Sequence, residues 1–294
     1  MRGAPAHKPL LGIGLVLLSG IFFTALDTTA KTLAQTYPVP LLIWMRYLVH
    51  LLLMLVFLGP TQGRKLVVTQ RPIALIVRAL ALLATTGLTI AAFRIMPLGE
   101  TTAIFFASPL AVAILAGPVL GEKVGRPRWL AMAIGFAGVL LVARPGGAMT
   151  SLGIALALGA AAVYTVYQLQ TRRLSTTEST VTMLFYTALV GTVIMSFGVP
   201  WFLDGPTPTP LETALFLALG VFGGTGHFLL TRAYLYAPAS VVASYLYVQI
   251  LWATLFGGLF FGHWPDALSI AGMITIATSS IAMVAYERHQ ARKT

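Results

Sequence analysis

The feature that most constrains this chain is an internal repeat with a constant offset of 141 residues. The tripeptide Leu-Gly-Ile at 11–13 recurs at 152–154, so that Gly12 and Gly153 stand 141 positions apart (153 − 12 = 141). The same offset places Pro97 on Pro238 much farther along each copy. One offset that holds near both ends of the copy indicates duplication of a whole structural unit.

The composition shows which kind of unit was duplicated. Of the 294 residues, 57% are hydrophobic and 9% are charged, and the mean hydropathy is +0.87, whereas soluble domains carry about 25% charged residues. This excludes a soluble globule and predicts an all-α integral membrane protein whose main partner is the lipid bilayer. The net charge of +11 is expected in cytoplasmic loops, so nucleic acid is not predicted as a partner. The chain has no cysteine, which excludes disulfides and thiolate metal sites.

Ten apolar segments are long enough to cross a bilayer, which takes about 20 residues as a helix. They are separated by short loops rich in proline or glycine. The predicted helices cover residues 10–34, 40–59, 72–96, 97–120, 127–144, 150–171, 180–201, 211–236, 238–261 and 266–286.

Lysine and arginine are distributed unequally over the two ends of these segments. With the N-terminus inside, 14 of the 19 lie at inner ends, 3 at outer ends and 2 within helices. Positively charged loops stay in the cytoplasm. The chain is therefore predicted to lie in a bacterial-type inner (plasma) membrane with both termini cytoplasmic.

Each copy holds five segments, an odd number, so the second copy must cross the membrane in the opposite sense. We predict one five-helix unit at residues 1–146 and a second, inverted unit at 147–294. Inverted repeats around a central cavity are the construction of many secondary transporters. Channels and membrane enzymes use them as well, so the architecture does not by itself establish transport.

Two motifs carry a resemblance to a known family. The third and eighth segments end in Ala92-Phe93-Arg94-Ile95-Met96-Pro97 and Ala233-Tyr234-Leu235-Tyr236-Ala237-Pro238, and Gly121-Glu122-Lys123 ends the fourth. Over nearly its whole length the chain resembles the drug/metabolite transporter superfamily in its EamA branch, and within it the YddG-type amino-acid exporters. The second copy departs from the motif, with Gly262-His263-Trp264 in place of Gly-Glu.

Charged side chains within the segments are candidates for function, because polar groups inside a bilayer are costly. Asp27 is the only carboxylate deep in a segment, and Arg46 lies at a similar depth in the next. They are predicted to form a binding, proton or gating site. The alternative is a structural ion pair, for which Lys31 lies one turn from Asp27 on the same helix face. Arg78 is predicted to snorkel to the membrane surface.

The sixth segment carries Tyr164 and Gln168 on one face, one helical turn apart. Gln168 is the repeat partner of Asp27, and Tyr164 is the partner of Phe23. Equivalent polar positions in the two units predict that both segments face one shared cavity. A hydrogen bond between neighbouring helices is the alternative for Gln168.

Three further segments contribute candidates for a substrate site. His227 follows a glycine cluster at 220–226, and a substrate or proton role competes with a structural hydrogen bond. Gln249 is the repeat partner of Ser108, which precedes the helix-breaking Pro109, and Ser244 lies in the same segment as Gln249. Proline frees a carbonyl one turn back, and in a membrane that carbonyl needs a partner or a water-lined cavity. The level of Ser108 and Gln249 is therefore predicted as the middle of the site, with Pro109 as a hinge.

The G-x-x-x-G pairs at 117/121 and 258/262 are predicted to be sites of close helix packing. A dimer contact is the less favoured interpretation, so a monomer is expected.

Together these features predict a secondary transporter that works by alternating access around one central cavity. No Walker A sequence, no metal site and no cofactor motif occurs. The family resemblance implies export of small metabolites, most of all amino acids, and the hydroxyl and amide groups of the candidate site suit zwitterions. The alternative is a passive uniporter or channel-like facilitator. An enzyme is not predicted, because the chain lacks a cluster such as H-E-x-x-H.

Overall fold

A computed structural model describes residues 9–108, 111–112, 115, 119, 126–143, 149–174, 177–198, 201–202, 206–236, 246 and 248–291. Within these ranges the regular structure is entirely helical, and each of the ten predicted segments contains helix. The helices of the first half are α1 (Pro9–Leu33), α2 (Val39–Gln62), a short 3₁₀ helix η1 (Gly63–Leu66), α3 (Pro72–Ile95), α4 (Leu98–Phe105) and α6 (Arg126–Ala143). Those of the second half are α7 (Ser151–Leu174), α8 (Thr180–Gly198), α9 (Pro210–Tyr236), α11 (Val248–Phe261) and α12 (Ala267–Ala291).

Length and hydropathy make six of the described helices clear candidates for crossing a membrane, namely α1, α2, α3, α7, α8 and α9. Shorter apolar stretches occur in α6, α11 and α12. Large apolar side chains are exposed on many of these helices, such as Phe57 and Phe197, where a soluble protein would carry polar groups. The protein is therefore a multi-pass membrane protein whose exposed apolar surface faces lipid.

The offset of 141 residues is preserved in the helix boundaries. α2 and α8 begin at 39 and 180, α3 and α9 end at 95 and 236, and α6 and α12 begin at 126 and 267. The unit boundary predicted between 146 and 147 lies outside the described residues.

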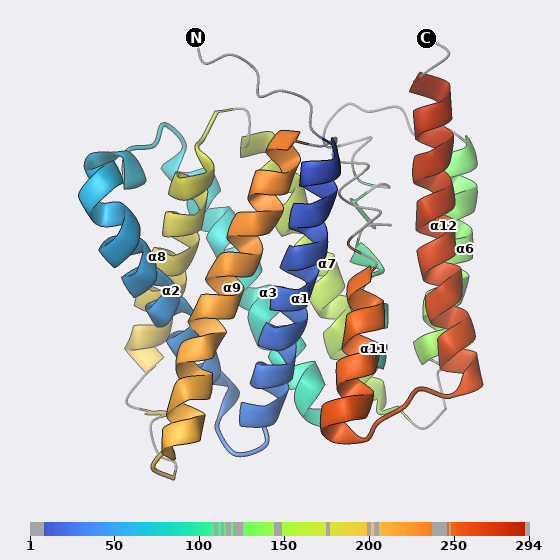
Figure 1. Cartoon of the computed structure of the whole chain (residues 1–294), viewed down its shortest axis with the longest axis horizontal. Helices are drawn as coiled ribbons and strands as arrows, with labels where there is room; N and C mark the ends of the chain where they lie inside the picture. The colour runs from blue at the N-terminus through green and yellow to red at the C-terminus, as the bar shows by residue number, and fades with distance from the viewer. Residues whose placement is uncertain are drawn as a thin grey trace.

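Equivalent helices of the two halves run in opposite directions, as Figure 1 shows for α1 and α7. Hydrogen bonds establish the same relation. Lys31, near the end of α1, bonds to carbonyls at the end of α3, so α1 and α3 run in parallel. Arg78, near the start of α3, bonds to Thr171 near the end of α7, so α3 and α7 run antiparallel. The two ends of the described chain consequently lie at the same end of the bundle (Figure 1).

The helices pack in pairs that join the two halves. α1 packs on α9 and α3 on α7, while α2 contacts both α8 and α9. α6 and α12 form a separate antiparallel pair at one side of the bundle (Figure 1). Gly138 and Gly272 let these two backbones touch, because a Cβ at Gly138 would come within 2.8 Å of the carbonyl oxygen of Gly272. The main core extends to this pair, because Val139 of α6 and Ile276 of α12 belong to the same apolar cluster as residues of α1, α2 and α9.

Several local predictions need correction. α11 ends at Phe261, and Gly262 has a φ of +68° with its amide bonded to the Gly258 carbonyl at 3.0 Å. Gly262 thus terminates the helix, since this left-handed conformation favours glycine, and it is not half of a packing pair. Gly258 packs against the Trp264 ring. The pair at 117/121 lies outside the described residues. α2 continues through Pro60, where a loop was predicted.

Two buried cations, Lys31 and Arg78, have other partners than the sequence suggested. Lys31 is 6% exposed, and its Nζ donates to the carbonyls of Phe93 and Met96 at 2.6 Å. It therefore caps the end of α3, where the helix dipole favours a cation, instead of pairing with Asp27. Arg78 does not snorkel. Its side chain is 1% exposed and is bonded to groups of α7 and α8.

Candidate functional site

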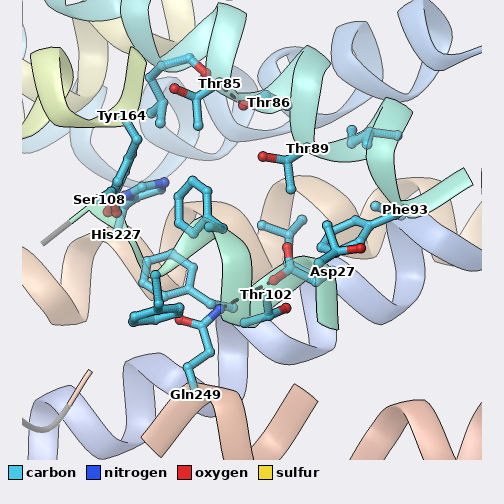
Figure 2. A pocket seen from close by; sticks show the side chains of 18 of the residues that line it. Asp27, Thr85, Thr86, Thr89, Phe93, Thr102, Ser108, Tyr164, His227 and Gln249 are labelled. Carbon is cyan, nitrogen blue, oxygen red and sulfur yellow. Dashed lines mark hydrogen bonds between the residues drawn. The ribbon is translucent and has the colours of Figure 1, made fainter. Parts of the chain in front are cut away.

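A cavity of about 90 Å³ lies at the centre of the bundle. Helices of both halves contribute to its wall (Figure 2). Its lining is Phe23, Leu26, Asp27, Ala30, Arg46, Leu82, Thr85, Thr86, Thr89, Ile90, Phe93, Thr101, Thr102, Phe105, Phe106, Ser108, Tyr164, Gln168, His227, Leu246 and Gln249.

Asp27 and Gln249 bring α1 and α11 together at this cavity. The Gln249 amide Nε2 donates to Asp27 Oδ2 at 3.3 Å. The bond orients the carboxylate and joins the two halves of the chain across the cavity wall. It leaves Asp27 Oδ1 without a bond among the described residues.

Arg46 and His227 join α2 to α9 in the same way. Arg46 Nη2 donates to His227 Nε2 at 3.4 Å, a long contact for a guanidinium, whose charged bonds usually measure about 2.7–2.9 Å. The His227 ring in turn stands edge-on to Phe23, with ring centroids 4.9 Å apart. Arg46 carries five N–H donors and makes no other side-chain hydrogen bond among the described residues.

The glycine cluster before His227 explains why α9 reaches so close to this site. A Cβ at Gly223 would lie 3.2 Å from Arg46 Nε, and one at Gly224 would lie 3.0 Å from the His50 ring. A Cβ at Gly226 would lie 2.8 Å from the Phe23 ring. The cluster therefore permits close helix packing, and His50 is a buried packing residue.

Aromatic rings and threonines complete the wall. Tyr164 contacts Phe105 with ring centroids 4.9 Å apart and stacks on Tyr167 at 5.4 Å. On the facing helix α3, the hydroxyls of Thr85 and Thr86 bond to carbonyls of their own helix. In Figure 2 Tyr164, Ser108 and His227 lie toward the left of the cavity, and Asp27, Thr89 and Phe93 toward the right.

The structure gathers most of the predicted candidates in one place. Seven of them line the cavity: Ser108, Tyr164, Gln168, His227, Gln249, Asp27 and Arg46. Ser244 and Pro109 lie outside the described residues, so the hinge stays a prediction. Among the described residues no three His, Asp or Glu side chains are grouped as a metal ion would need.

Five threonines of the cavity lining were not predicted from the sequence, namely Thr85, Thr86, Thr89, Thr101 and Thr102. The search for polar residues at repeat-equivalent positions passed over Thr89, because its partner is the apolar Leu230. Thr85 and Thr89 are one helical turn apart and lie on one face of the helix. That spacing was the sequence signal for a polar face.

A multi-pass helical bundle with a cavity lined by both of its halves is an arrangement that membrane transporters use. The model of the EamA-like transporter family matches the chain twice, at residues 10–144 and 151–285. The two matches begin 141 residues apart (151 − 10 = 141). This chain therefore belongs to the EamA-like transporter family, part of the drug/metabolite transporter superfamily.

Relatives resemble the chain over nearly their full length. An S-adenosylmethionine uptake transporter of Rickettsia conorii is 29% identical, covering 95% of this chain and 94% of the relative. A pseudopaline exporter of Pseudomonas aeruginosa is 26% identical over 92% and 95%, and a riboflavin transporter of Vibrio cholerae is 26% identical over 98% and 97%. These names do not single out the amino-acid exporters. A solved protein structure matches the fold with a TM-score of 0.65 at 17% identity, covering 92% of this chain and 97% of that one.

Proposed function

We propose that this chain is a secondary transporter that exports small zwitterionic metabolites, amino acids above all, by alternating access. One observation carries the proposal. The cavity between the two oppositely directed halves holds one acidic and one basic side chain, Asp27 and Arg46, together with neutral hydroxyl and amide groups. A phosphate or nucleotide cargo would favour clustered cations instead.

The relatives support transport of small metabolites, since the cargoes in their names are S-adenosylmethionine, pseudopaline and riboflavin. Their names include both uptake and export, so the direction for this chain rests on its resemblance to amino-acid exporters. The bacterial relatives and the excess of lysine and arginine at one end of the helices support an inner membrane with cytoplasmic termini.

Counterflow in proteoliposomes tests this function. Vesicles loaded with one of the twenty unlabelled amino acids should accumulate the same labelled amino acid from outside, saturably and faster than protein-free vesicles. A pH gradient imposed across the vesicle should change the rate if transport is coupled to protons. Asp27→Asn should reduce the flux. Glu212→Gln is the matched control, because Glu212 is a carboxylate at the start of α9 that bonds to Thr209 away from the cavity.

Two outcomes would contradict the proposal. If no amino acid exchanges above the protein-free background, amino-acid transport is wrong. If flux occurs without stimulation by substrate on the opposite side and without saturation, the chain is a channel-like facilitator and alternating access is wrong.

A further inference from the structure

Two threonine hydroxyls at the cavity have no partner. Among the described residues six buried side-chain atoms make no hydrogen bond, and two of these, Thr89 Oγ1 and Thr102 Oγ1, belong to residues that line the cavity. Thr102 itself is 3% exposed. Most threonines in these helices bond to a carbonyl one turn back, as Thr85 and Thr86 do. A buried hydroxyl without a partner is destabilising, so one on a cavity-lining residue is a candidate for bonding the cargo.

Thr89 lies at the level of Asp27. α1 and α3 are parallel, and Lys31 on α1 bonds to the Phe93 carbonyl on α3. One turn earlier on each helix stand Asp27 and Thr89, four residues before Lys31 and Phe93. The parallel register therefore places Asp27 and Thr89 at a similar height on neighbouring helices, and in Figure 2 both lie toward the right of the cavity, with Thr89 above Asp27.

Thr102 reaches the same level from α4. This helix contacts α11, where a Cβ at Gly99 would lie 3.1 Å from Thr254 Oγ1. Leu98 lies beside Gly257, so the two helices run antiparallel, and Thr102 stands near Gln249. Since Gln249 donates to Asp27, the second orphaned hydroxyl also belongs to the surroundings of that carboxylate (Figure 2).

Asp27, Thr89 and Thr102 each bring to the cavity lining one oxygen acceptor that has no hydrogen bond among the described residues. Asp27 Oδ2 is held by the Gln249 amide, which leaves Oδ1 available together with the hydroxyl oxygens of Thr89 and Thr102. A primary ammonium group carries three N–H donors and no acceptor. Three oxygens, one of them charged, match those three donors.

We propose that Asp27, Thr89 and Thr102 seat the ammonium group of the cargo, and that Arg46 binds its carboxylate. The assignment rests on the proposed function and narrows it to metabolites that carry a free amino-acid group. Asp27 and Arg46 thus act as the two ends of a zwitterion site, with Thr89 and Thr102 as specificity determinants. A sodium ion could use the same three oxygens, but it would leave the open guanidinium of Arg46 without a ligand.

Matched ligands test the assignment. The probe is the amino acid with the highest counterflow, compared with the same molecule lacking the amino group and the same molecule lacking the carboxyl group. Binding to the purified protein is measured by tryptophan fluorescence, with sodium replaced by choline in a parallel series. The complete amino acid should bind at least about tenfold more tightly than either analogue, since one charge-assisted hydrogen bond contributes that much.

Three variants locate the ammonium. Thr89→Val and Thr102→Val should each weaken binding of the amino acid about tenfold and leave binding of the deaminated analogue unchanged. Because each change removes an orphaned hydroxyl, the melting temperature without ligand should stay the same or rise. Thr24→Val is the matched control, because Thr24 has an equally buried and unpartnered hydroxyl on α1 but does not line the cavity. It should leave both ligands' binding unchanged.

The results separate this inference from the proposed function. If Thr89→Val and Thr102→Val weaken binding of the deaminated analogue as much as binding of the amino acid, the hydroxyls contact another part of the cargo and the ammonium seat is overturned. Binding that disappears in choline would assign the three oxygens to sodium, and would also overturn it. Saturable transport of riboflavin, which has no ammonium group, without transport of any amino acid would overturn both the zwitterion site and the proposed amino-acid function. Amino-acid transport with unchanged amino-acid binding in Thr89→Val and Thr102→Val would overturn the ammonium seat alone. Absence of all transport would count against the proposed function itself.

Discussion

The two ends of the bundle contain repeat-equivalent joints that are built from opposite kinds of side chain. At the end where the termini lie, α3 packs on α7 and α8, and Arg78 donates to Thr171, Thr187 and Tyr167 at 2.7 Å each and to the Met183 carbonyl at 3.0 Å. We call these residues the Arg78 joint. The offset of 141 maps them onto α9, α1 and α2 at the opposite end, as Leu219, Ala30, Arg46, Leu26 and Leu42, which we call the Leu219 joint. Leu219 is 0% exposed, and all of its members except Arg46 belong to one apolar core.

The comparison shows that the duplicated units have divided two tasks between them. In the Arg78 joint the cation is on the central helix and makes four hydrogen bonds to neutral oxygens. Its guanidinium carbon also lies 4.4 Å from the centroid of the Tyr167 ring. In the Leu219 joint the cation is Arg46, at the position equivalent to Thr187. Arg46 lines the cavity and makes one hydrogen bond, from Nη2 to His227 Nε2 at 3.4 Å. One arginine therefore fastens helices, and the other is available to a ligand.

The strongest test of this difference is Leu219→Arg, which gives the apolar joint the central residue of the polar one. A guanidinium at this site would be buried among leucines without the acceptors that Arg78 has, and it would lie near Arg46. The expected loss in free energy of unfolding exceeds about 4 kcal/mol, measured by denaturation in SDS-containing micelles.

Leu219→Met is the control for that variant, because it conserves volume and should cost less than about 1.5 kcal/mol. A folded Leu219→Arg protein of normal stability would mean that the apolar joint can supply acceptors or water, and the distinction between the joints would fail.

The reverse exchange, Arg78→Leu, should have the next largest effect. It removes four hydrogen bonds that join three helices, and it leaves the Tyr167 hydroxyl without its donor while Thr171 and Thr187 keep backbone acceptors. We expect a loss of about 2–4 kcal/mol in the free energy of unfolding.

Adding Tyr167→Phe to Arg78→Leu should restore about 1 kcal/mol, since the orphaned hydroxyl is then gone. The same denaturation measurement applies. If Arg78→Leu is as stable as the wild type, the cost of burying the guanidinium cancels its bonds, and the Arg78 joint is not the stronger fastening.

The sequence was sufficient for the large-scale fold, because that depends on long-range periodicity. Segment lengths and the offset of 141 located helix in all ten segments, although α4 and α11 cover only part of the predicted ranges 97–120 and 238–261. Positions facing a shared cavity were also predictable, since Asp27 and Gln168 are related by the repeat and both line it. What composition and spacing supply is the depth and face of a residue.

They do not supply its partners, and the incorrect predictions for Arg78 and Lys31 were of that kind. The depth of Arg78 in the sequence predicted snorkelling. The sequence did not show that Tyr167, Thr171 and Thr187 converge on this side chain. Lys31 was considered as a partner of Asp27 because they are one turn apart, whereas the end of α3 offers it two free carbonyls. Thr102 had no comparable signal in the sequence and lines the cavity through tertiary packing.

A smaller effect should come from Gly220→Ala, which tests how closely the helices of the Leu219 joint approach. A Cβ here would contact the Val49 side chain and lie 2.8 Å from the His50 backbone nitrogen, so α9 would have to move away from α2. The expected loss is about 1–3 kcal/mol. Gly14→Ala is the control, since nothing lies within 4 Å of a Cβ there and helix propensity should add up to about 1 kcal/mol.

The equivalent position in the Arg78 joint is Ala79, where a Cβ is already accommodated at 0% exposure. The close backbone approach is thus a property of the apolar joint. Normal stability of Gly220→Ala would show that the Leu219 joint accommodates an added methyl group, so that close packing does not stabilise it.

The smallest change in stability is expected for Arg46→Thr, which gives the Leu219 joint the residue that its counterpart has in Thr187. Arg46 has one long hydrogen bond, to His227, and its guanidinium carbon lies 5.6 Å from the centroid of the Tyr47 ring. Its loss should therefore alter the free energy of unfolding by no more than about 1 kcal/mol. Amino-acid counterflow should nevertheless fall sharply, because the guanidinium is the cation available to a cargo carboxylate. Arg78→Leu provides the opposite pattern, a large loss of stability with the cavity lining unchanged. If Arg46→Thr unfolds the protein as readily as Arg78→Leu does, both arginines are structural and the division of tasks between the joints is wrong.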